Sequence, residues 1–323
     1  MTIQPFSLRH LQPAARLAEQ LYRRERAHVP VLPDRDLTAN FAAYLRSLPA
    51  DAGVVAVEDG VLLGYLCALP VDRMFGLCPG AYSPLWAHGA ACRPREVIPR
   101  LYEAVGGDWV RGGRLTHSVA LYAHDPEAIA AWFELGFGGR CVDAIRALGP
   151  VEGARATGLT IRRADARDAA ALLPLFAALD GALSRPPLFM PVFAPPTREQ
   201  VRASLTQDEV WAAFDGSEAV GYLLLRPQAE TFVAADPDTR NICGAYVRED
   251  QRGAGVAAAL LQAAVDALAA AGYARCGVDY ECFNRLGSRF WDRHFTRYTA
   301  GVTRRIDERI LWANERRLET GRL

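Results

Sequence analysis

The feature that most limits how this chain can fold is an internal repeat. Val54–Pro70 (VVAVEDGVLLGYLCALP) and Val210–Pro227 (VWAAFDGSEAVGYLLLRP) each place an Asp-Gly turn between two apolar runs rich in β-formers. This pattern predicts a β-hairpin in each half of the chain. Gly64 and Gly221, the matching glycines of the two hairpins, lie 157 positions apart. A repeat of that size indicates duplication of a whole domain and not a solenoid of short units.

The end of each half supports the same organisation. The stretch AWFELGF (131–137) resembles RFWDRHF (289–295), and the intervening segment Leu148–Gly158 is rich in Gly, Pro and Ala, as linkers are. We therefore expect two domains, residues 1–150 and 151–323. In each, the order of helices, hairpin, strand, long helix, strand, short helix and last strand predicts an α/β (α+β) fold, with a central mixed β-sheet flanked by helices.

The composition excludes several classes of function. The 37 basic and 37 acidic residues cancel, so the chain lacks the bulk attraction that nucleic-acid backbones exert on basic proteins. No run approaches the ~20 apolar residues that span a bilayer, and the N-terminus has no signal-peptide pattern. The seven cysteines are never spaced CxxC, and the six histidines show neither HxH nor HExxH spacing. We expect no nucleic acid, membrane or metal partner. We also expect that the thiols are reduced and that the protein is cytoplasmic.

The sharpest local signal lies between residues 242 and 273. Ile242–Val247 predicts a buried strand, and Gly253-Ala254-Gly255 opens a helix that Gly272 ends. The first N–H groups of a helix have no partner within it, and the helix dipole adds partial positive charge, so this end attracts anions. Glycines leave no Cβ to hold a phosphate away, and Arg252 adds a full charge. The pattern matches neither the P-loop nor the dinucleotide fingerprint.

Two motifs of the second half resemble those of the GNAT superfamily of acyl-CoA-dependent N-acyltransferases. The first resembles its pyrophosphate-binding motif R/Q-x-x-G-x-G/A, and its residues are Arg252, Gly253, Ala254, Gly255, Val256 and Ala257. The second resembles its closing motif, and its residues are Asn284, Gly287, Phe290, Trp291 and Phe295. The resemblance covers Leu159–Asp307. Because the first half has the same outline, the chain is similar to tandem GNAT proteins.

The resemblance implies an N-acetyltransferase with acetyl-CoA as co-substrate, acting by direct attack of an amine in a ternary complex. The backbone N–H groups of residues 253–257 would hold the pyrophosphate. Ala245, Tyr246 and Val247 would pair with the pantetheine amides and direct an N–H at the thioester oxygen, a contact worth on the order of 3 kcal/mol in acyl transfer. Asn284 would bond the pantetheine arm or the surroundings of the amine.

At the matching place, the first half reads HGAACRPREVIPRLYEAV (88–105), with no Gly-x-Gly before its helix. Pro94 and Pro99 remove N–H donors there. We therefore interpret the first half as a degenerate copy without coenzyme, and the alternative is coenzyme in both halves.

The catalytic groups are less clearly marked. The family often places a tyrosine acid seven residues after the asparagine, but here that position is Trp291, whose indole N–H is not a usable acid. Tyr298 or water could protonate the thiolate instead. Strand alternation puts Asp279 and Glu281 on one face, and we take Glu281 as the candidate base, with Tyr246 as a further candidate.

The acceptor is expected to be a small molecule with a primary amine. The apolar, proline-rich segment Ser184–Pro196 borders the acceptor in the family and is expected to do so here. Two alternatives stay open: a catalytically weak acyl-CoA sensor, indicated by Trp291, and an enzyme that acetylates peptide or protein N-termini. A tandem repeat can mimic a dimer within one chain, so the protein is expected to be a monomer or a homodimer.

Overall fold

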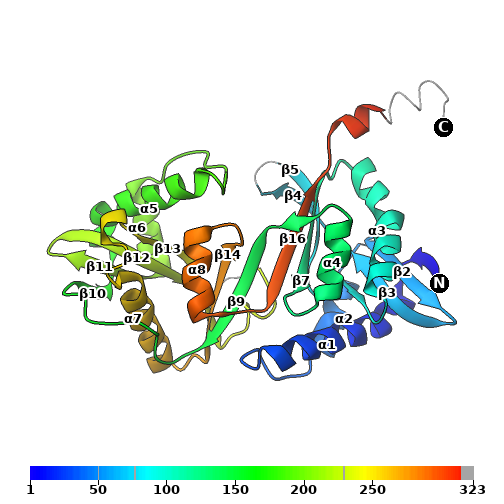
Figure 1. The fold of residues 1–323 in the computed structure, drawn as a ribbon, viewed down its shortest axis with the longest axis horizontal. Coiled ribbons are helices and arrows are strands. Elements are labelled where there is room, and N and C mark those ends of the chain that lie inside the picture. Colours follow the sequence, from blue (N-terminus) through cyan, green and yellow to red (C-terminus); the bar gives the residue numbers. More distant parts are fainter. Residues whose placement is uncertain (50, 76–77, 228–229, 314–323) are drawn as a thin grey trace. The chain divides into compact units, whose positions relative to one another are not determined.

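The computed structural model describes residues 1–49, 51–75, 78–227 and 230–313, and its chain forms two compact units (Figure 1). The first unit contains Met1–Pro30, Asp34–Val142 and the described residues 298–313. The second contains Val31–Pro33 and Asp143–Arg297. In the described part of the chain, no helix combines the length and apolar character that crossing a bilayer demands.

The first unit consists of two sheets with helices packed on them. The sheet orders are β1-β2-β3-β6 and β4-β5-β7-β16-β8, in which β5 and β7 run parallel. The strands are β1 (Thr2–Pro5), β2 (Gly53–Glu58), β3 (Val61–Cys67), β4 (Leu69–Met74), β5 (Cys78–Ser83), β6 (His88–Ala90), β7 (Thr116–Tyr122), β8 (Gly138–Gly139) and β16 (Thr299–Arg305). The helices are α1 (Leu11–His28), α2 (Thr38–Arg46), α3 (Pro94–Arg111) and α4 (Pro126–Glu134).

The second unit has one seven-stranded sheet, in the order β10-β11-β12-β13-β14-β9-β15. The strands β10 to β13 are antiparallel neighbours, whereas β13 and β14 run parallel. The strands are β9 (Cys141–Ala147), β10 (Thr160–Arg163), β11 (Glu209–Asp215), β12 (Glu218–Arg226), β13 (Thr239–Val247), β14 (Arg275–Glu281) and β15 (Thr296–Arg297). The helices are α5 (Ala169–Ser184), α6 (Arg198–Gln207), α7 (Val256–Ala270) and α8 (Arg285–His294).

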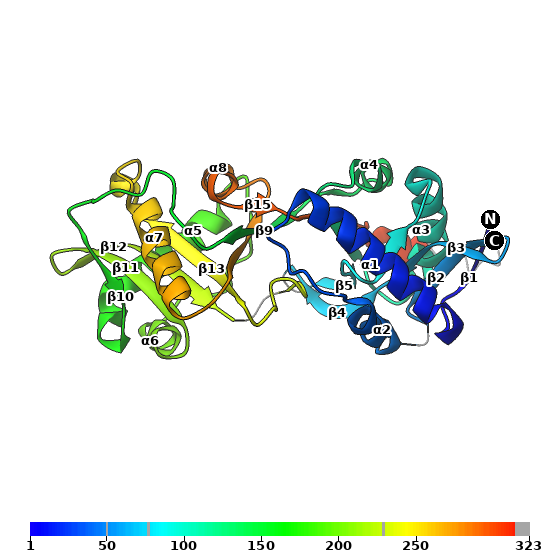
Figure 2. The ribbon, with the colours of Figure 1, turned by 90° about the horizontal axis from the view of Figure 1, so that it is seen from below.

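The expected fold class is confirmed, since both units have mixed sheets flanked by helices (Figures 1 and 2). Both predicted hairpins form, as β2-β3 and as β11-β12. Each hairpin also carries a register shift at the same repeat position, after Ala56 in the first and after Ala213 in the second. A bulge of this kind adds a residue to one strand and re-aims its neighbours, so the two hairpins share this irregularity as well as their sequence pattern.

The last strand of each half lies in the sheet of the other unit. β9, the final strand of the first repeat, lies between β14 and β15, whereas β16, the final strand of the second repeat, pairs with β7 over its full length. Figure 1 shows β16, coloured red, beside the first-repeat strand β7. The expected boundary at residue 150 therefore separates the two repeats in sequence but not the two compact units, and residues 314–323 of the expected second domain lie outside the described residues.

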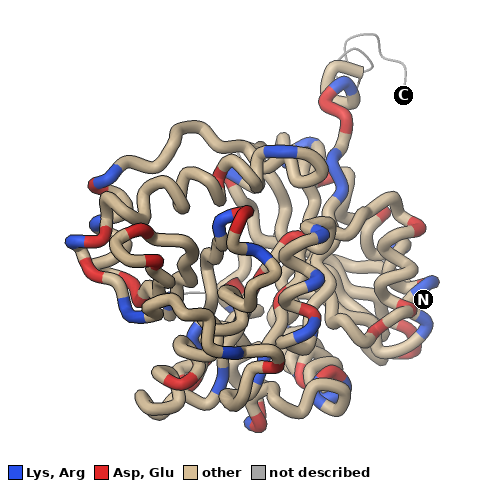
Figure 3. Tube along the Cα trace, turned by 60° about the vertical axis from the view of Figure 1, so that its left-hand side comes forward, with Lys and Arg blue, Asp and Glu red and all other residues tan. Residues whose placement is uncertain are grey.

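The helix behind the glycine turn forms as the sequence predicts. Its apolar stripe is buried: Leu260, Leu261, Ala264, Val265 and Leu268. α7 ends at Ala270, and Gly272 adopts a φ of +85°, the left-handed conformation common just after a helix. Basic and acidic residues are interspersed along the trace of both units, without a long run of either sign (Figure 3).

Candidate functional site

The parallel strands β13 and β14 of the second unit separate partway along their length. Their register runs from Thr239 opposite Arg275 to Ile242 opposite Val278, and both strands continue beyond this last pair. On its other side, β13 stays paired with β12 as far as Val247, with a register shift at Cys243. The part of β13 from Gly244 to Val247 therefore turns one edge toward the gap, where its backbone groups can bond an extended ligand.

The glycine turn lies directly beyond this gap, at the beginning of α7. Gly255 is the N-cap residue with φ +90°, and Gly253 has φ +79°. Both conformations favour glycine, and a Cβ at Gly253 would meet nothing within 4 Å, so the turn is open at this residue, whereas a Cβ at Gly255 would lie 3.2 Å from Nε of Arg155. Arg252 is anchored by a bond from its Nε to the carbonyl of Val247 (3.1 Å), and its guanidinium lies 5.4 Å from the Tyr246 ring centroid.

A cavity of about 490 Å³, here called the large cavity, extends along the gap. Of the residues expected to bind the coenzyme, those that line it are Ala245, Tyr246, Val247, Arg252, Gly253, Ala257 and Asn284. Gly255 and Val256 line an adjoining cavity of about 360 Å³, here called the adjoining cavity, while Ala254 lines neither of the two. The structure thus brings nearly the whole expected set together.

Asn284 owes its position to the start of α8. Its side-chain Oδ1 caps that helix by accepting from the backbone N–H of Gly287 (3.0 Å), which leaves the Nδ2 amide as a donor for a ligand. A Cβ at Gly287 would lie 2.7 Å from that Nδ2, so this glycine is required for the close approach. Trp291, further along α8, is buried and contributes its ring to the wall of the large cavity.

The proline-rich segment and helix α5 form a wall of the large cavity that the coenzyme motif does not indicate. Pro186, Pro187 and Leu188 line it, as the resemblance implies for a segment that borders the acceptor. Sequence reasoning did not single out Leu179, Leu183 or Tyr222, which also line it. Leu179 and Leu183 are four residues apart on α5, and this helical spacing beside a proline-rich loop was an available signal.

Tyr222 is held rigidly in this wall. Its side chain is 2% exposed, and its ring stacks on Phe176 of α5, with centroids 4.3 Å apart and an angle of 6° between the planes. Burial, and secondarily the charge of Asp180, raises the pKa of its hydroxyl well above the usual value. Tyr222 is therefore a protonated, buried tyrosine in the wall of the large cavity.

Two carboxylates follow the point at which β13 and β14 separate. Asp279 comes directly after the last paired residue, Val278, and its side chain remains exposed. Desolvation by the surrounding protein, and then repulsion from Glu230, raises the pKa of Asp279 to about 6. Glu281, the expected base, lies two residues further along β14 and is half-buried. The sequence placed both carboxylates on one strand face, but only the strand register shows which one is nearer to the divergence. Neither carboxylate is among the residues that line the large cavity or the adjoining cavity.

Tyr298, the expected acid, is not brought to this site. It belongs to the first unit, where it is 1% exposed and its carbonyl accepts from the N–H of Ala123 (3.1 Å). It does not line the large cavity, whereas the tyrosines Tyr222 and Tyr246 do. The reason is the strand exchange: the chain leaves the second unit after Arg297, so Tyr298 packs with the first.

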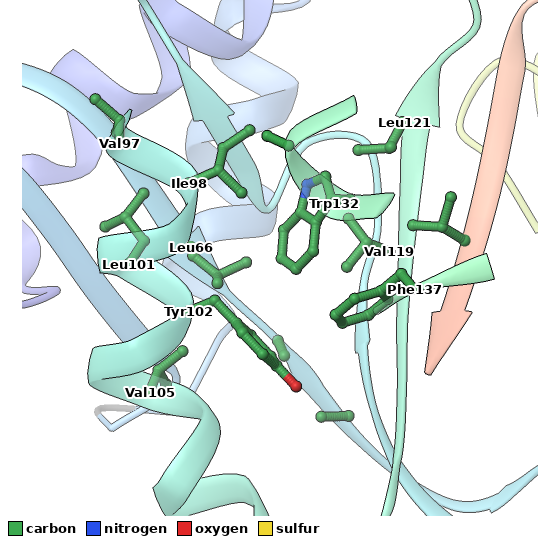
Figure 4. Packing of buried hydrophobic residues seen from close by; sticks show 14 of the residues in the cluster. Leu66, Val97, Ile98, Leu101, Tyr102, Val105, Val119, Leu121, Trp132 and Phe137 are labelled. Carbon is green, nitrogen blue, oxygen red and sulfur yellow. The ribbon is translucent and has the colours of Figure 1, made fainter. Parts of the chain in front are cut away.

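The corresponding place in the first unit is closed. β6 pairs with β3 as β13 pairs with β12, so that His88 occupies the position of Ala245. The His88 ring donates from Nε2 to the carbonyl of Ala120 on β7 (2.8 Å) and thereby bridges the two strands. Trp132 is 1% exposed and lies between α3 and β7 with Phe137 (Figure 4). The cavity left there measures about 10 Å³, roughly the space of one water molecule.

The N-terminus of α3 is also unlike that of α7. Arg93 is its N-cap residue in the left-handed conformation (φ +47°), and Pro94 follows, so one N–H donor is missing. The Arg93 side chain is paired with Glu58 (2.6 Å) and Glu96 (3.2 Å). Among the described residues, no group of three or more His, Cys, Asp or Glu side chains is arranged to hold a metal ion in either unit.

Comparisons with known proteins agree with this geometry. Residues 182–293 match the model of the acetyltransferase (GNAT) family. The chain is similar to the structure of a GCN5-related N-acetyltransferase from Sphaerobacter thermophilus, with 17% identity, a TM-score of 0.58, and coverage of 94% of this chain and 95% of that one.

It is also similar to a GCN5-related glucosamine N-acetyltransferase region in a fungal multi-domain β-N-acetylglucosaminidase, with 12% identity, a TM-score of 0.53, and coverage of 94% of this chain and 38% of that one. At such identities these likenesses show the fold alone. A search of curated proteins found no matching sequence. Residues 182–293 of the second unit therefore match the model of the acetyltransferase (GNAT) family, within a chain whose fold resembles that of GCN5-related N-acetyltransferases.

Proposed function

We propose that the protein is an N-acetyltransferase that moves an acetyl group from acetyl-CoA to the primary amine of a small molecule, at the large cavity of the second unit. The observation that carries this proposal is the meeting of three features at one cavity. The free edge of β13 can bond an amide-containing arm, the glycine turn before α7 can hold phosphates, and an apolar wall from α5 can receive an acceptor.

The residues of the second unit fit the parts of acetyl-CoA. The N–H groups of residues 253–257 would hold the pyrophosphate, with the charge of Arg252 beside them. Backbone groups of Ala245, Tyr246 and Val247 would pair with the pantetheine amides, and Asn284 would donate from Nδ2 to the arm. When bound, the thioester supplies the acetyl group, and an N–H of β13 directed at its oxygen would stabilise the negative charge that develops there.

The amine must lose protons during the reaction, and β14 offers the groups to take them. We propose Asp279, ahead of Glu281, as the acceptor of that proton. It follows the last residue paired with β13, and desolvation raises its pKa to about 6, which leaves it ionised at neutral pH and close to the operating range that favours proton transfer. Glu281 remains the second candidate, since it shares the strand face of Asp279.

Direct transfer is favoured over an acyl-enzyme. Cys243 is the thiol next to the strand divergence, and burial raises its pKa to about 11, so the reactive thiolate is scarce at neutral pH. The chain contains no lysine, so no side-chain amine of its own can be acetylated. Intact-mass measurement after incubation with acetyl-CoA alone should therefore show no added acetyl group. A stable adduct on Cys243 would indicate transfer through the enzyme.

One coenzyme per chain is proposed. The bridge from His88 to Ala120 and the buried Trp132 fill, in the first unit, the space that the second unit leaves open. The N-terminus of α3 is also a poorer phosphate site than the glycine turn before α7, because Pro94 has no N–H and the Arg93 side chain is already paired with Glu58. The first unit is thus proposed to be a degenerate copy with a structural role.

The decisive experiment combines an acceptor panel with a variant of the glycine turn. Wild-type protein and Gly255→Asp are assayed with acetyl-CoA against amino acids, polyamines, a hexosamine, aminoglycosides and short peptides. The variant adds bulk and negative charge where phosphate should bind, so several charge-assisted hydrogen bonds of roughly 1.5–3 kcal/mol each are lost. We expect coenzyme affinity to fall at least a hundredfold.

A matched control separates this effect from backbone strain. Gly216 also has a positive φ (+57°), in the hairpin turn of β11 and β12, and a Cβ there would meet nothing within 4 Å. Gly216→Asp should therefore keep wild-type coenzyme affinity while it introduces comparable strain. Equal coenzyme affinity in Gly255→Asp and wild type would refute the assigned site. Turnover of peptides in preference to free amines would favour the peptide N-terminal activity.

A second candidate function has one observation in its favour. Trp291 stands in the large cavity at the position where the family often has its tyrosine acid, and an indole N–H cannot supply a proton. A catalytically weak acyl-CoA sensor would bind the coenzyme normally and show no turnover across the whole panel. Sustained turnover of any acceptor would show that the protein is an enzyme and not a sensor.

A further inference from the structure

The adjoining cavity lies at the glycine turn but leads away from the large cavity. The two share Val247, Arg252, Gly253, Ala257 and Phe290, so they meet at the turn itself. A ligand whose phosphates rest on the turn, with its amide-containing arm in the large cavity, would extend its other end into the adjoining cavity. This inference therefore rests on the proposed function and concerns the nucleotide end of the coenzyme.

The segment between the repeats forms part of the adjoining cavity. Val151 is buried and donates its N–H to Oε1 of Gln262 on α7 (2.6 Å), while the Arg146 guanidinium bonds the carbonyls of Gly149 (3.1 Å) and Pro150 (3.0 Å). These bonds hold the segment on the second unit. As a result, Arg155 lies over the turn, with its Nε 3.2 Å from the place of a Cβ on Gly255.

The charges that line this cavity are mostly positive. Arg155, Arg252 and Arg293 are opposed by one carboxylate, that of Glu152. Arg293 pairs with Glu152 only loosely, at 3.5 Å, and both side chains are more than 60% exposed. Arg155 has no hydrogen-bond or ion-pair partner among the described residues, so its guanidinium is available to a ligand. Arginine suits phosphate because its planar fork can donate two parallel bonds.

We propose that Arg155 of the inter-repeat segment and Arg293 of α8 bind the phosphate on the ribose of coenzyme A. Arg252 and the backbone N–H groups of the turn bind the pyrophosphate, whereas Arg155 and Arg293 line the adjoining cavity, into which the nucleotide extends. The segment that joins the repeats is thus also part of the ligand site. Glu152 opposes the bound phosphate and releases Arg293 when the ligand enters.

The test compares coenzyme A with 3′-dephospho-coenzyme A, by calorimetric titration of the full chain at fixed, low ionic strength. Wild type should bind coenzyme A at least tenfold more tightly. Arg155→Gln and Arg293→Gln should each weaken coenzyme A binding by severalfold to tenfold and leave dephospho-coenzyme A binding within twofold. The double variant should bind the two ligands almost equally. Glu152→Gln should tighten coenzyme A binding alone.

Arg289→Gln is the matched control, since Arg289 lies one turn before Arg293 on α8, is exposed, and lines neither cavity. It should leave both affinities unchanged. The inference is overturned if the Arg155 and Arg293 variants weaken both ligands to the same degree, or if they weaken neither. If wild type binds neither ligand, the proposed function itself fails, and this outcome is distinct from the other two.

Discussion

The Nε2 of His88 on β6 donates to the carbonyl of Ala120 on β7, 2.8 Å away, and this bond spans the place where the corresponding strands of the second unit diverge. Ala245 holds the position of His88 in the second repeat and has no side chain that could form such a bridge. This strand position is therefore one of the differences between the closed unit and the open one, together with the buried Trp132. Burial lowers the pKa of His88, so the ring is neutral and its Nε2 hydrogen is kept for this bond.

The first prediction concerns stoichiometry. Calorimetric titration of the wild-type chain with acetyl-CoA should give a value near one, because only the second unit has the open cavity and the glycine turn. In Gly255→Asp the signal should be lost altogether and not halved. A value near two in wild type would contradict the closure of the first unit.

The second prediction concerns the strand exchange. A fragment of residues 141–297 keeps the whole seven-stranded sheet and should show cooperative thermal unfolding. A fragment of residues 151–323 lacks β9, which contributes the buried Ala144 and Ile145 between β14 and β15, and should not. Removal of an internal strand leaves unpaired backbone edges on both neighbours. Cooperative unfolding of both fragments at similar temperatures would contradict this role of β9.

The third prediction concerns the pH dependence of stability. His117 is fully buried, accepting at Nδ1 from the Tyr102 hydroxyl (2.7 Å) and donating from Nε2 to the carbonyl of Arg114 (2.9 Å). Burial lowers its pKa to about 4. The unfolded chain then binds a proton that the folded chain does not, so stability should fall from about pH 6.5 toward pH 4.

Protonation of this one ring in the unfolded chain lowers the free energy of unfolding by roughly 3 kcal/mol at most. Denaturant unfolding of wild type and His117→Gln at several pH values measures this loss of stability. The variant should lose part of the decline in unfolding free energy over this pH range, whatever its stability at neutral pH. Identical slopes for the two proteins would show that His117 does not carry the effect.

The fourth prediction concerns the base. For Asp279 to accept a proton it must be ionised, so kcat/KM should rise with pH through about pH 6 and level off above it. Asp279→Asn should lower kcat by about 10²-fold and remove that limb of the profile. Glu281→Gln should retain the limb. If instead Glu281→Gln alone removes the pH dependence of kcat/KM near pH 6, Glu281 is the base.

The fifth prediction concerns the acid. Trp291→Phe keeps an aromatic ring in the cavity wall and removes the indole N–H, so turnover should stay within about tenfold, allowing up to ~1.5 kcal/mol for one lost hydrogen bond. Tyr298→Phe should likewise have a small effect, since Tyr298 is buried in the first unit. Tyr222→Phe and Tyr246→Phe are the informative variants, because both hydroxyl-bearing residues line the cavity. A 10²-fold loss in Tyr298→Phe with the fold intact would return that residue to the mechanism.

Much of this molecule is determined by the sequence alone. Local preferences of neighbouring residues determine the two similar hairpins and the helix α7, which begins at Val256 and ends just before Gly272. The glycine turn is equally local, because a positive φ at Gly253 and Gly255 requires little outside the turn itself. For that reason most of the residues that line the two cavities around this turn, together with Asn284, could be named from the sequence.

Only the tertiary structure decided the rest. The exchange of β9 and β16 depends on strand pairing between distant residues, and an alternating apolar pattern does not specify the partner sheet. It removed Tyr298 from the site. The choice between Asp279 and Glu281 depended on where β13 and β14 separate, and Arg155 reached the turn because Gln262 and Arg146 hold the linker. Long-range pairing and packing set these positions, and no local preference encodes them.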